Sequence, residues 1–264
     1  MKDFTLGILQ FSARDDAVAS LERIKQILSQ YSVNADLIIL PEYSNADPTG
    51  LSRDTVLERA EKHGGYFTRG LEMLAEDYGV YILAGLLERE GECAYSSVLY
   101  VTPSSESKIV YRKRILFDAL GVRESDILCP GKTQPPVLNL PFARIGLLVC
   151  FELRFPEIAR QLALQGAEVV VAPTAWFQGH LKEEQLVAIA KTRAMENTVY
   201  LAIASQWSNK FTGRSIVVDP YGATRLDLGS GERYGEAFIE SAYLKEVRTQ
   251  LPLLKILREN LMKN

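Results

Sequence analysis

The spacing of apolar residues along the chain alternates between the periods of strands and helices. Residues 4–11 (FTLGILQF) have the alternation and the β-forming residues of a strand, and residues 37–40 (LIIL) form an apolar run typical of a buried strand. Between these strands, apolar residues recur every three or four positions, which predicts an amphipathic helix. The apolar positions of this helix are Val18, Leu21, Ile24, Leu28 and Tyr31. A second helix, with Phe67, Leu71, Leu74 and Tyr78 on one side, is predicted to end at Gly79.

The same reading extends over the rest of the chain. Strands are predicted at 80–87, 97–101, 108–111, 144–149, 168–171, 200–204, 214–218 and about 236–241, and helices at 155–164, 182–197 and from 244 onward, with a break at Pro252. A polar loop with Pro48 and Gly50 follows the strand at 37–40. Residues 113–136 are rich in glycine and proline and are predicted to be an irregular active-site loop, because structureless stretches of this length are usually functional.

The order of these elements predicts one α/β domain over residues 1–264. No repeat, low-complexity segment or linker interrupts the chain. Two runs of strands without helices, at 80–111 and 200–241, argue against a purely parallel doubly wound sheet. Sheets packed face to face, with helices outside, would show such runs.

Composition and charge narrow the class of protein. The chain has 264 residues, of which 47% are hydrophobic and 24% charged, enough apolar material for a sizeable core. The net charge of −3 predicts no nucleic-acid partner and no anionic membrane partner. The most apolar run, residues 145–151, is far shorter than the roughly 20 residues that span a bilayer. Residues 1–10 lack the pattern of a signal peptide, so we expect a soluble cytoplasmic protein.

The cysteines and histidines limit the possible sites. Cys93, Cys129 and Cys150 lie far apart without a CxxC motif, which predicts neither a disulfide framework nor a zinc site and favours a reducing compartment. A papain-like protease needs a Cys-His pair, yet no CGSCW-type block surrounds any cysteine, and His63 and His180 are the only histidines. His180 is interpreted as a loop residue. No metal or organic cofactor is expected, because ligand clusters and phosphate-binding glycine loops are absent from the sequence.

Three residues with complementary chemistry stand where predicted strands end. Glu42 follows the strand at 37–40, Lys113 follows KIVYR, and Cys150 follows RIGLLV. A cysteine thiol, with an ordinary pKa of about 8.5, needs activation to attack a substrate. A carboxylate can accept its proton, and an ammonium can stabilise an oxyanion. Taken singly, each also fits a structural role: a small buried side chain, a loop carboxylate and a solvated basic cluster.

Five blocks of sequence make the prediction more specific. They are LPEY around Glu42, YRKRILFD around Lys113, GLLVCFELRFPEIAR around Cys150, TRAMENTVYLAIASQ at 192–206 and GRSIVVDPYG at 213–222. In this order the chain resembles the nitrilase superfamily of carbon-nitrogen hydrolases over nearly its whole length. The resemblance implies a four-layer α-β-β-α sandwich and a catalytic triad of Glu42, Lys113 and Cys150.

The resemblance also implies further site residues. A second active-site glutamate corresponds to Glu124 in ESDILCPG. Phe151, Arg154 and Trp176 are the implied substrate-binding residues, and the arginine contacts a substrate carboxylate in some relatives but is structural in others. Two positions depart from the family pattern: Phe151-Glu152 replaces a frequent Tyr-Asp pair, and Leu186 stands where a tryptophan is common.

The implied activity is hydrolysis of a small amide to a carboxylic acid and ammonia through a cysteine thioester. The blocks look most like the branch that acts on ω-amides of keto acids or on deaminated glutathione, so a carboxylate-bearing amide is the expected substrate. A carbamoyl hydrolase, a nitrilase and a catalytically idle binding protein of the same fold remain alternatives. A homodimer or higher homo-oligomer is expected, with the tail at 244–264, and especially its apolar stretch 251–261, packing on a partner subunit or on its own.

Overall fold

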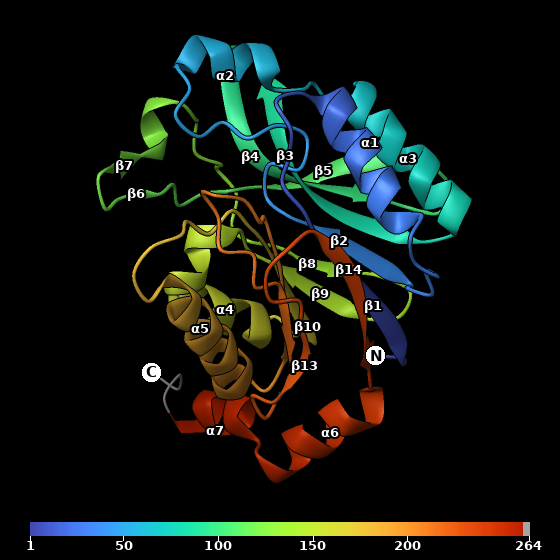
Figure 1. Ribbon diagram of the computed structural model, residues 1–264. Helices are drawn as coiled ribbons and strands as arrows, with labels where there is room; N and C mark the ends of the chain where they lie inside the picture. Colours follow the sequence, from blue (N-terminus) through green and yellow to red (C-terminus); the bar gives the residue numbers. More distant parts are fainter. Residues whose placement is uncertain (261–264) are drawn as a thin grey trace.

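Two six-stranded sheets pack face to face, with helices on their outer faces (Figure 1). The computed structural model describes residues 1–260, and all statements on the structure concern these residues. This arrangement is the predicted four-layer α-β-β-α sandwich. Between the sheets lies the largest apolar core, which contains residues of both inner faces.

The strands of each sheet come from one half of the chain, apart from the last strand. The first sheet has the order β14-β1-β2-β3-β4-β5 and the second the order β13-β12-β11-β10-β9-β8. The first contains β1 Phe4–Gln10, β2 Leu37–Leu40, β3 Tyr81–Glu90, β4 Cys93–Val101, β5 Ser107–Arg112 and β14 Arg233–Ile239. The second contains β8 Val137–Asn139, β9 Arg144–Leu147, β10 Val169–Thr174, β11 Tyr200–Ser205, β12 Ile216–Val218 and β13 Thr224–Asp227.

The helices cover the outer faces through their apolar sides. Buried residues of α1 (Ala17–Leu28) and α3 (Tyr66–Tyr78) pack in one core on the first sheet, and α4 (Pro156–Leu164) and α5 (Lys182–Asn197) cover the second. Asp16 caps the start of α1 by accepting a hydrogen bond from the Ala19 amide. Gly79 ends α3 with a left-handed φ of 66°, as the sequence predicted.

The position of strand β2 between two cores explains why its sequence is apolar throughout. Leu37 and Ile39 belong to the core between the sheets, whereas Ile38 and Leu40 belong to the core beneath α1 and α3. Successive side chains of a strand point to opposite faces, and here both faces are covered.

Parallel pairing places the ends of several strands at one edge of the sandwich. Strand β2 is parallel to β1 and β3, and β10 is parallel to β9 and β11. Loops that follow these strands therefore meet, because side chains beyond the carboxyl ends of parallel strands collect at the same edge. Glu42 follows β2, Cys150 follows β9 by three residues and Ala175 follows β10.

Several short structures were not predicted from the sequence. Helix α2 (Arg53–Arg59) lies in the segment expected to be a loop, and its N-terminus is capped by Ser52. Strand β13 was missed because only one of its four residues is even partly buried, so it carries no apolar pattern. The expected irregular segment 113–136 contains a small hairpin, β6 (Asp118–Ala119) and β7 (Val122–Arg123), and the 3-10 helix η1 (Glu124–Asp126).

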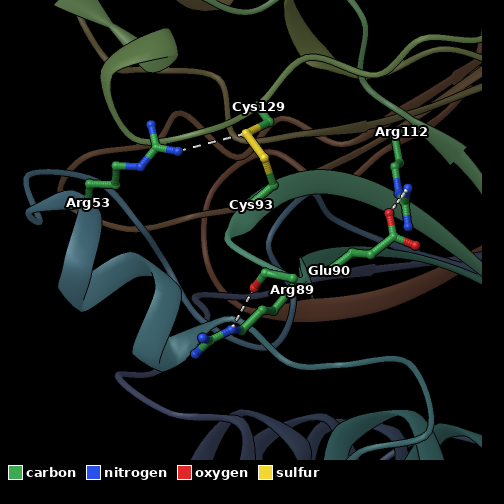
Figure 2. The surroundings of a disulfide bond; sticks show 7 residues. Arg53, Arg89, Glu90, Cys93, Arg112 and Cys129 are labelled. Atoms are coloured by element: carbon green, nitrogen blue, oxygen red, sulfur yellow. Dashed lines mark hydrogen bonds and ion pairs between the residues drawn. A yellow bond between two sulfur atoms is a disulfide. The ribbon is translucent and has the colours of Figure 1, made fainter.

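The prediction that the cysteines form no disulfide is wrong. Cys93 and Cys129 are bonded, with their Cα atoms 5.7 Å apart (Figure 2). The chain after η1 runs beside the start of β4, where the Cys129 amide donates a 2.8 Å hydrogen bond to the Ala94 carbonyl. The spacing of cysteines in the sequence could not reveal this contact, because it joins segments separated by 36 residues. Cys150 is the free cysteine of the described chain.

The described part of the C-terminal tail packs on its own subunit. Helix α6 (Ser241–Gln250) buries Leu244 and Val247, and α7 (Leu253–Asn260) donates a hydrogen bond from Arg258 to the carbonyl of Leu164. Residues 261–264 of the predicted tail lie outside the described residues. Within residues 1–260, no helix has the length and apolar character needed to cross a membrane.

Candidate active site

Glu42 is buried at the edge where the loops meet, with 1% of its surface exposed. One carboxylate oxygen, Oε1, accepts hydrogen bonds from Lys113 Nζ at 3.0 Å and Ser96 Oγ at 2.8 Å. The other oxygen accepts one from the Ala175 amide at 3.1 Å, so Glu42 connects both sheets. Burial raises the pKa of Glu42, against the opposing effect of the Lys113 charge. A carboxyl group with a raised pKa is suited to accept and return a proton near neutral pH.

The ammonium of Lys113 bridges two carboxylates. Its Nζ lies 3.0 Å from Glu42 Oε1 and 2.9 and 2.8 Å from the two oxygens of Glu124. Burial alone would lower the pKa of Lys113, but the charges of Glu124 and Glu42 outweigh burial and raise it. Lys113 therefore stays protonated, which makes it a cation for a developing negative charge and not a base.

Glu124 is held in place by donors other than Lys113. The Tyr43 hydroxyl donates to Oε1 at 2.5 Å, and the Phe117 amide donates to Oε2 at 2.6 Å. Glu124 begins η1, so the segment predicted as an active-site loop does contribute a buried carboxylate next to Lys113.

Cys150 begins a 3-10 helix, η2 (Cys150–Arg154), and has a left-handed φ of 46°. Such a backbone conformation is uncommon for residues other than glycine and often marks functional sites. Burial raises the pKa of the Cys150 thiol, and the Glu42 charge adds to this effect. The resting thiol is therefore protonated, and its reaction requires a base.

The four predicted catalytic residues line one cavity of about 320 Å³. Its aromatic lining residues are Tyr43, Phe117, Phe151, Trp176, Phe177 and Phe211. The structure thus brings together Glu42, Lys113, Cys150 and Glu124. The predicted substrate-binding residues Phe151, Arg154 and Trp176 line the same cavity. His180 is exposed and does not line it, as expected for a loop residue.

Besides Lys113, and Arg123 with its partner Asp126 at 3.5 Å, two more cations line this cavity. The Arg154 guanidinium stacks on the Trp176 ring at 4.5 Å and donates to Gln185 Oε1 at 3.0 Å. Burial lowers the pKa of Lys182, and the neighbouring Arg154 charge lowers it further. In the part of the chain that the structure describes, neither residue forms an ion pair with a carboxylate. Together they give the cavity a positive region suited to an anionic group.

Several residues of the site were not predicted from the sequence. Tyr43 and Ser96 bind the two glutamates, and Lys182 adds a further cation to the cavity lining. Tyr43 follows Glu42 in the LPEY block, and that adjacency is the only sequence signal for it. Ser96 comes from the middle of β4, and no sequence signal indicated its contact with Glu42. Within residues 1–260, no cluster of His, Cys, Asp or Glu side chains has the arrangement of a metal site.

Gly85 of β3 allows the backbone of Pro41 and Glu42 to pass close to this strand. A Cβ atom at this position would lie 2.3 Å from the Pro41 carbonyl oxygen and 2.4 Å from the Glu42 Cα. No side chain fits there without moving Glu42, so the absence of one helps to set the position of the carboxylate.

Comparison with known proteins decides the family. Residues 6–249 match the sequence profile of the carbon-nitrogen hydrolases. The chain belongs to the carbon-nitrogen hydrolase family. The resemblance to the nitrilase superfamily is thereby confirmed, and so is the prediction of a hydrolase that acts on carbon-nitrogen bonds.

Relatives of this hydrolase include named amidases. It is 37% identical over 144 residues to deaminated glutathione amidase of Escherichia coli O157:H7, an alignment that spans about half of each chain, 54% and 55%. It is 29% identical to the ω-amidase of Danio rerio over 274 residues, which covers 99% of this chain and 97% of that one.

Solved structures share its fold. The carbon-nitrogen hydrolase superfamily protein XC1258 of Xanthomonas campestris superimposes with a TM-score of 0.85, at 23% identity and 97% coverage of both chains. An amidase from Nesterenkonia sp. AN1 superimposes with a TM-score of 0.76 at 26% identity, covering 94% of this chain and 95% of that one. In that structure, a variant of the amidase, the acetamide moiety of fluoroacetamide is covalently added to the active-site cysteine.

Proposed function

We propose that this carbon-nitrogen hydrolase is an amidase that cleaves a small, carboxylate-bearing ω-amide to a carboxylic acid and ammonia. The observation that carries the proposal is the buried Lys113 ammonium between Glu42 and Glu124, at the same cavity as Cys150. The amidase names of its relatives support an amide as the substrate.

The first half of the proposed reaction forms a thioester. Glu42 accepts the proton of the Cys150 thiol as the sulfur attacks the amide carbon, and the carbonyl oxygen becomes an oxyanion. Lys113 and the Phe151 N–H stabilise this charge; within residues 1–260 that N–H has no backbone acceptor. Loss of one such donor typically costs on the order of 100- to 1000-fold in rate. When the carbon-nitrogen bond breaks, protonated Glu42 gives its proton to the leaving nitrogen, and ammonia departs.

The second half hydrolyses the thioester. Glu42 accepts a proton from water as the oxygen attacks the acyl carbon. The carbon-sulfur bond then breaks, the acid is released, and the sulfur takes the proton back. Glu124 keeps Lys113 in register through both halves, which is consistent with its two contacts to the ammonium.

The substrate carboxylate is proposed from Arg154 and Lys182, which line the cavity. Arg154 and Lys182 are partly withdrawn from water and lack carboxylate partners in the described chain. A substrate anion would replace the lost solvation of both charges, and hydrogen bonds between charged groups are the strongest that side chains form. The amide group, at the other end of the substrate, would then reach Cys150.

Ammonia release from a panel of substrates tests this proposal. The panel contains glutaramate-like ω-amides, the corresponding amides without a carboxylate, N-carbamoyl amino acids and simple nitriles. We expect the highest kcat/KM for carboxylate-bearing ω-amides, with at least a tenfold preference over the neutral amides. A preference for carbamoyl compounds or nitriles would replace the proposed substrate class. Absence of turnover over the whole panel, together with no alkylation of Cys150 by iodoacetamide at mildly basic pH, would favour a binding protein of this fold.

Two further properties stay predictions. A cytoplasmic location stays a prediction, and the Cys93–Cys129 bond removes the argument for it from unpaired cysteines. Assembly into a homo-oligomer also stays a prediction, but it no longer rests on the tail, whose described part packs on its own subunit. Light scattering coupled to size-exclusion chromatography tests it; a monomer would contradict it.

A further inference from the structure

Glu152 is a buried carboxylate that contacts neither the cavity nor a cation in residues 1–260. Its Oε1 accepts hydrogen bonds from the Tyr111 hydroxyl at 2.6 Å and from the amides of Arg114 and Ile115 at 2.9 and 3.2 Å. Its Oε2 accepts one from the Val149 amide at 2.8 Å. A buried charge without such partners would cost several kcal/mol, so these donors together accommodate it.

These donors come from the two segments that carry reactive groups. Tyr111, Arg114 and Ile115 flank Lys113, which lies on the first sheet's side of the site. Val149 directly precedes Cys150, on the second sheet's side. One carboxylate thus spans from the segment of the ammonium to the segment of the thiol.

We propose that Glu152 is a positioning residue that holds Lys113 and Cys150 in their reactive arrangement. Backbone amides on both sides point at the same charged group, so neither segment can shift without losing a charge-assisted hydrogen bond. A misplacement of about 1 Å at a reactive group can cost on the order of 100-fold in rate. The inference rests on the proposed roles of Lys113 and Cys150 but adds a residue that never touches the substrate.

The roles of positioning and of simple space-filling predict opposite orders for two substitutions. Glu152→Gln keeps the size of the side chain but loses the charge and turns an N–H toward a donor. Glu152→Asp keeps the charge and loses one methylene group. If Glu152 positions the two segments, Glu152→Asp lowers kcat several-fold but by less than about tenfold, because its shorter side chain displaces the segments slightly, whereas Glu152→Gln loses about 100-fold. If it only fills space, Glu152→Gln is the milder change.

The experiment measures kcat and KM of both variants on the amide that turns over fastest, together with their thermal midpoints. KM should change less than threefold, because Glu152 does not line the cavity. Tyr111→Phe is the matched control: it removes one of the four donors and leaves the backbone donors of both segments, so its kcat should stay within threefold. An equal or higher kcat for Glu152→Gln than for Glu152→Asp, at native-like midpoints, would overturn the proposal.

A second readout needs no amide substrate. The rate at which iodoacetamide alkylates Cys150 at neutral pH depends on proton transfer to Glu42. We expect Glu152→Gln to lower this rate to that of Glu42→Gln, with no further loss in the double variant, because both act on the same step. Additive losses would overturn the proposal. If Glu152→Gln does not fold, Glu152→Asp decides alone: an alkylation rate several-fold below wild type supports positioning, and a wild-type rate contradicts it. The alkylation rate can be measured even if the protein hydrolyses no amide of the panel, so the two proposals are tested separately.

Discussion

The Lys113 ammonium and the Glu42 carboxylate lie 3.0 Å apart in a site where each is 99% buried. The base of the proposed reaction is thus in contact with the cation that would meet the oxyanion. Glu124 shares the same ammonium, so two carboxylates compete for one positive charge. This imbalance contributes to the raised pKa of Glu42 and fits a group that must accept and return a proton in each half of the reaction.

Replacement of the nucleophile should abolish turnover without unfolding the protein. Cys150→Ala removes only the thiol of a cysteine that is not part of the disulfide. We expect kcat below 0.1% of wild type, on the order of the loss of a nucleophile elsewhere, with a native far-ultraviolet circular dichroism spectrum. Mass spectrometry of the wild type, quenched during turnover, should detect an acyl adduct on Cys150. Wild-type activity in the alanine variant would disprove the thioester route.

The pH dependence of kcat/KM should show the raised pKa of Glu42. Only the deprotonated carboxylate can accept the thiol proton, so activity falls as pH drops through this pKa. We expect the acid limb above the ordinary glutamate value of about 4.3. Ser96→Ala removes a hydrogen bond that lowers the pKa of Glu42, so its acid limb should move to still higher pH. A shift to lower pH would contradict the assignment of this limb to Glu42.

Removal of Arg154 or Lys182 should weaken binding of carboxylate-bearing amides only. A hydrogen bond between charged groups contributes about 1.5–3 kcal/mol, so Arg154→Gln should raise KM for such amides roughly 10- to 100-fold. Lys182→Gln should have the same direction of effect. The matching neutral amide serves as the control, and its KM should change less than threefold in both variants. Equal effects on both amides would argue that Arg154 supports the structure of η2 instead.

A methyl group at position 85 should displace the backbone of Glu42. Gly85→Ala places a Cβ 2.3 Å from the Pro41 carbonyl oxygen, so the loop with Glu42 must move. We expect a fall in kcat of about 100-fold and a loss of about 1–3 kcal/mol in the free energy of unfolding. Gly91→Ala is the control for kcat alone: a Cβ there meets no atom within 4 Å, so the site is untouched, but its φ of 60° makes any side chain costly for stability. Unchanged kcat in Gly85→Ala would show that the loop adapts.

Loss of the disulfide should lower the stability of the fold. The bond closes a loop across a sequence separation of 36 residues and fastens the segment after Glu124 to β4. Disulfides that close loops of this kind typically contribute about 2–4 kcal/mol. The double variant Cys93→Ser/Cys129→Ser should therefore unfold at a lower temperature than wild type. Reductant should lower the wild-type midpoint and leave the double variant unaffected; a wild-type midpoint insensitive to reductant would contradict the prediction.

The sequence alone determined the elements with strong periodic patterns and the residues at strand ends. Helix α5 has the bounds that were predicted, and α3 ends at the expected glycine. Glu42, Lys113 and Cys150 were identified because an apolar strand followed by a reactive residue is a local signal. The five sequence blocks then supplied the family. The match to the family profile confirmed the class of enzyme, and the structure confirmed the layered fold.

Only the tertiary structure decided which side chains hold these residues in place. Ser96 binds Glu42 from the middle of β4, Tyr43 binds Glu124, and Glu152 binds the backbone beside Lys113 and Cys150; these partners lie far apart in sequence or carry no local pattern that predicts the contact. The bond between Cys93 and Cys129 was excluded from spacing and is nevertheless present. Hydrophobic periodicity and sequence motifs depend only on residues that are neighbours in the sequence. Burial, hydrogen bonding and pKa depend on segments that folding alone brings together.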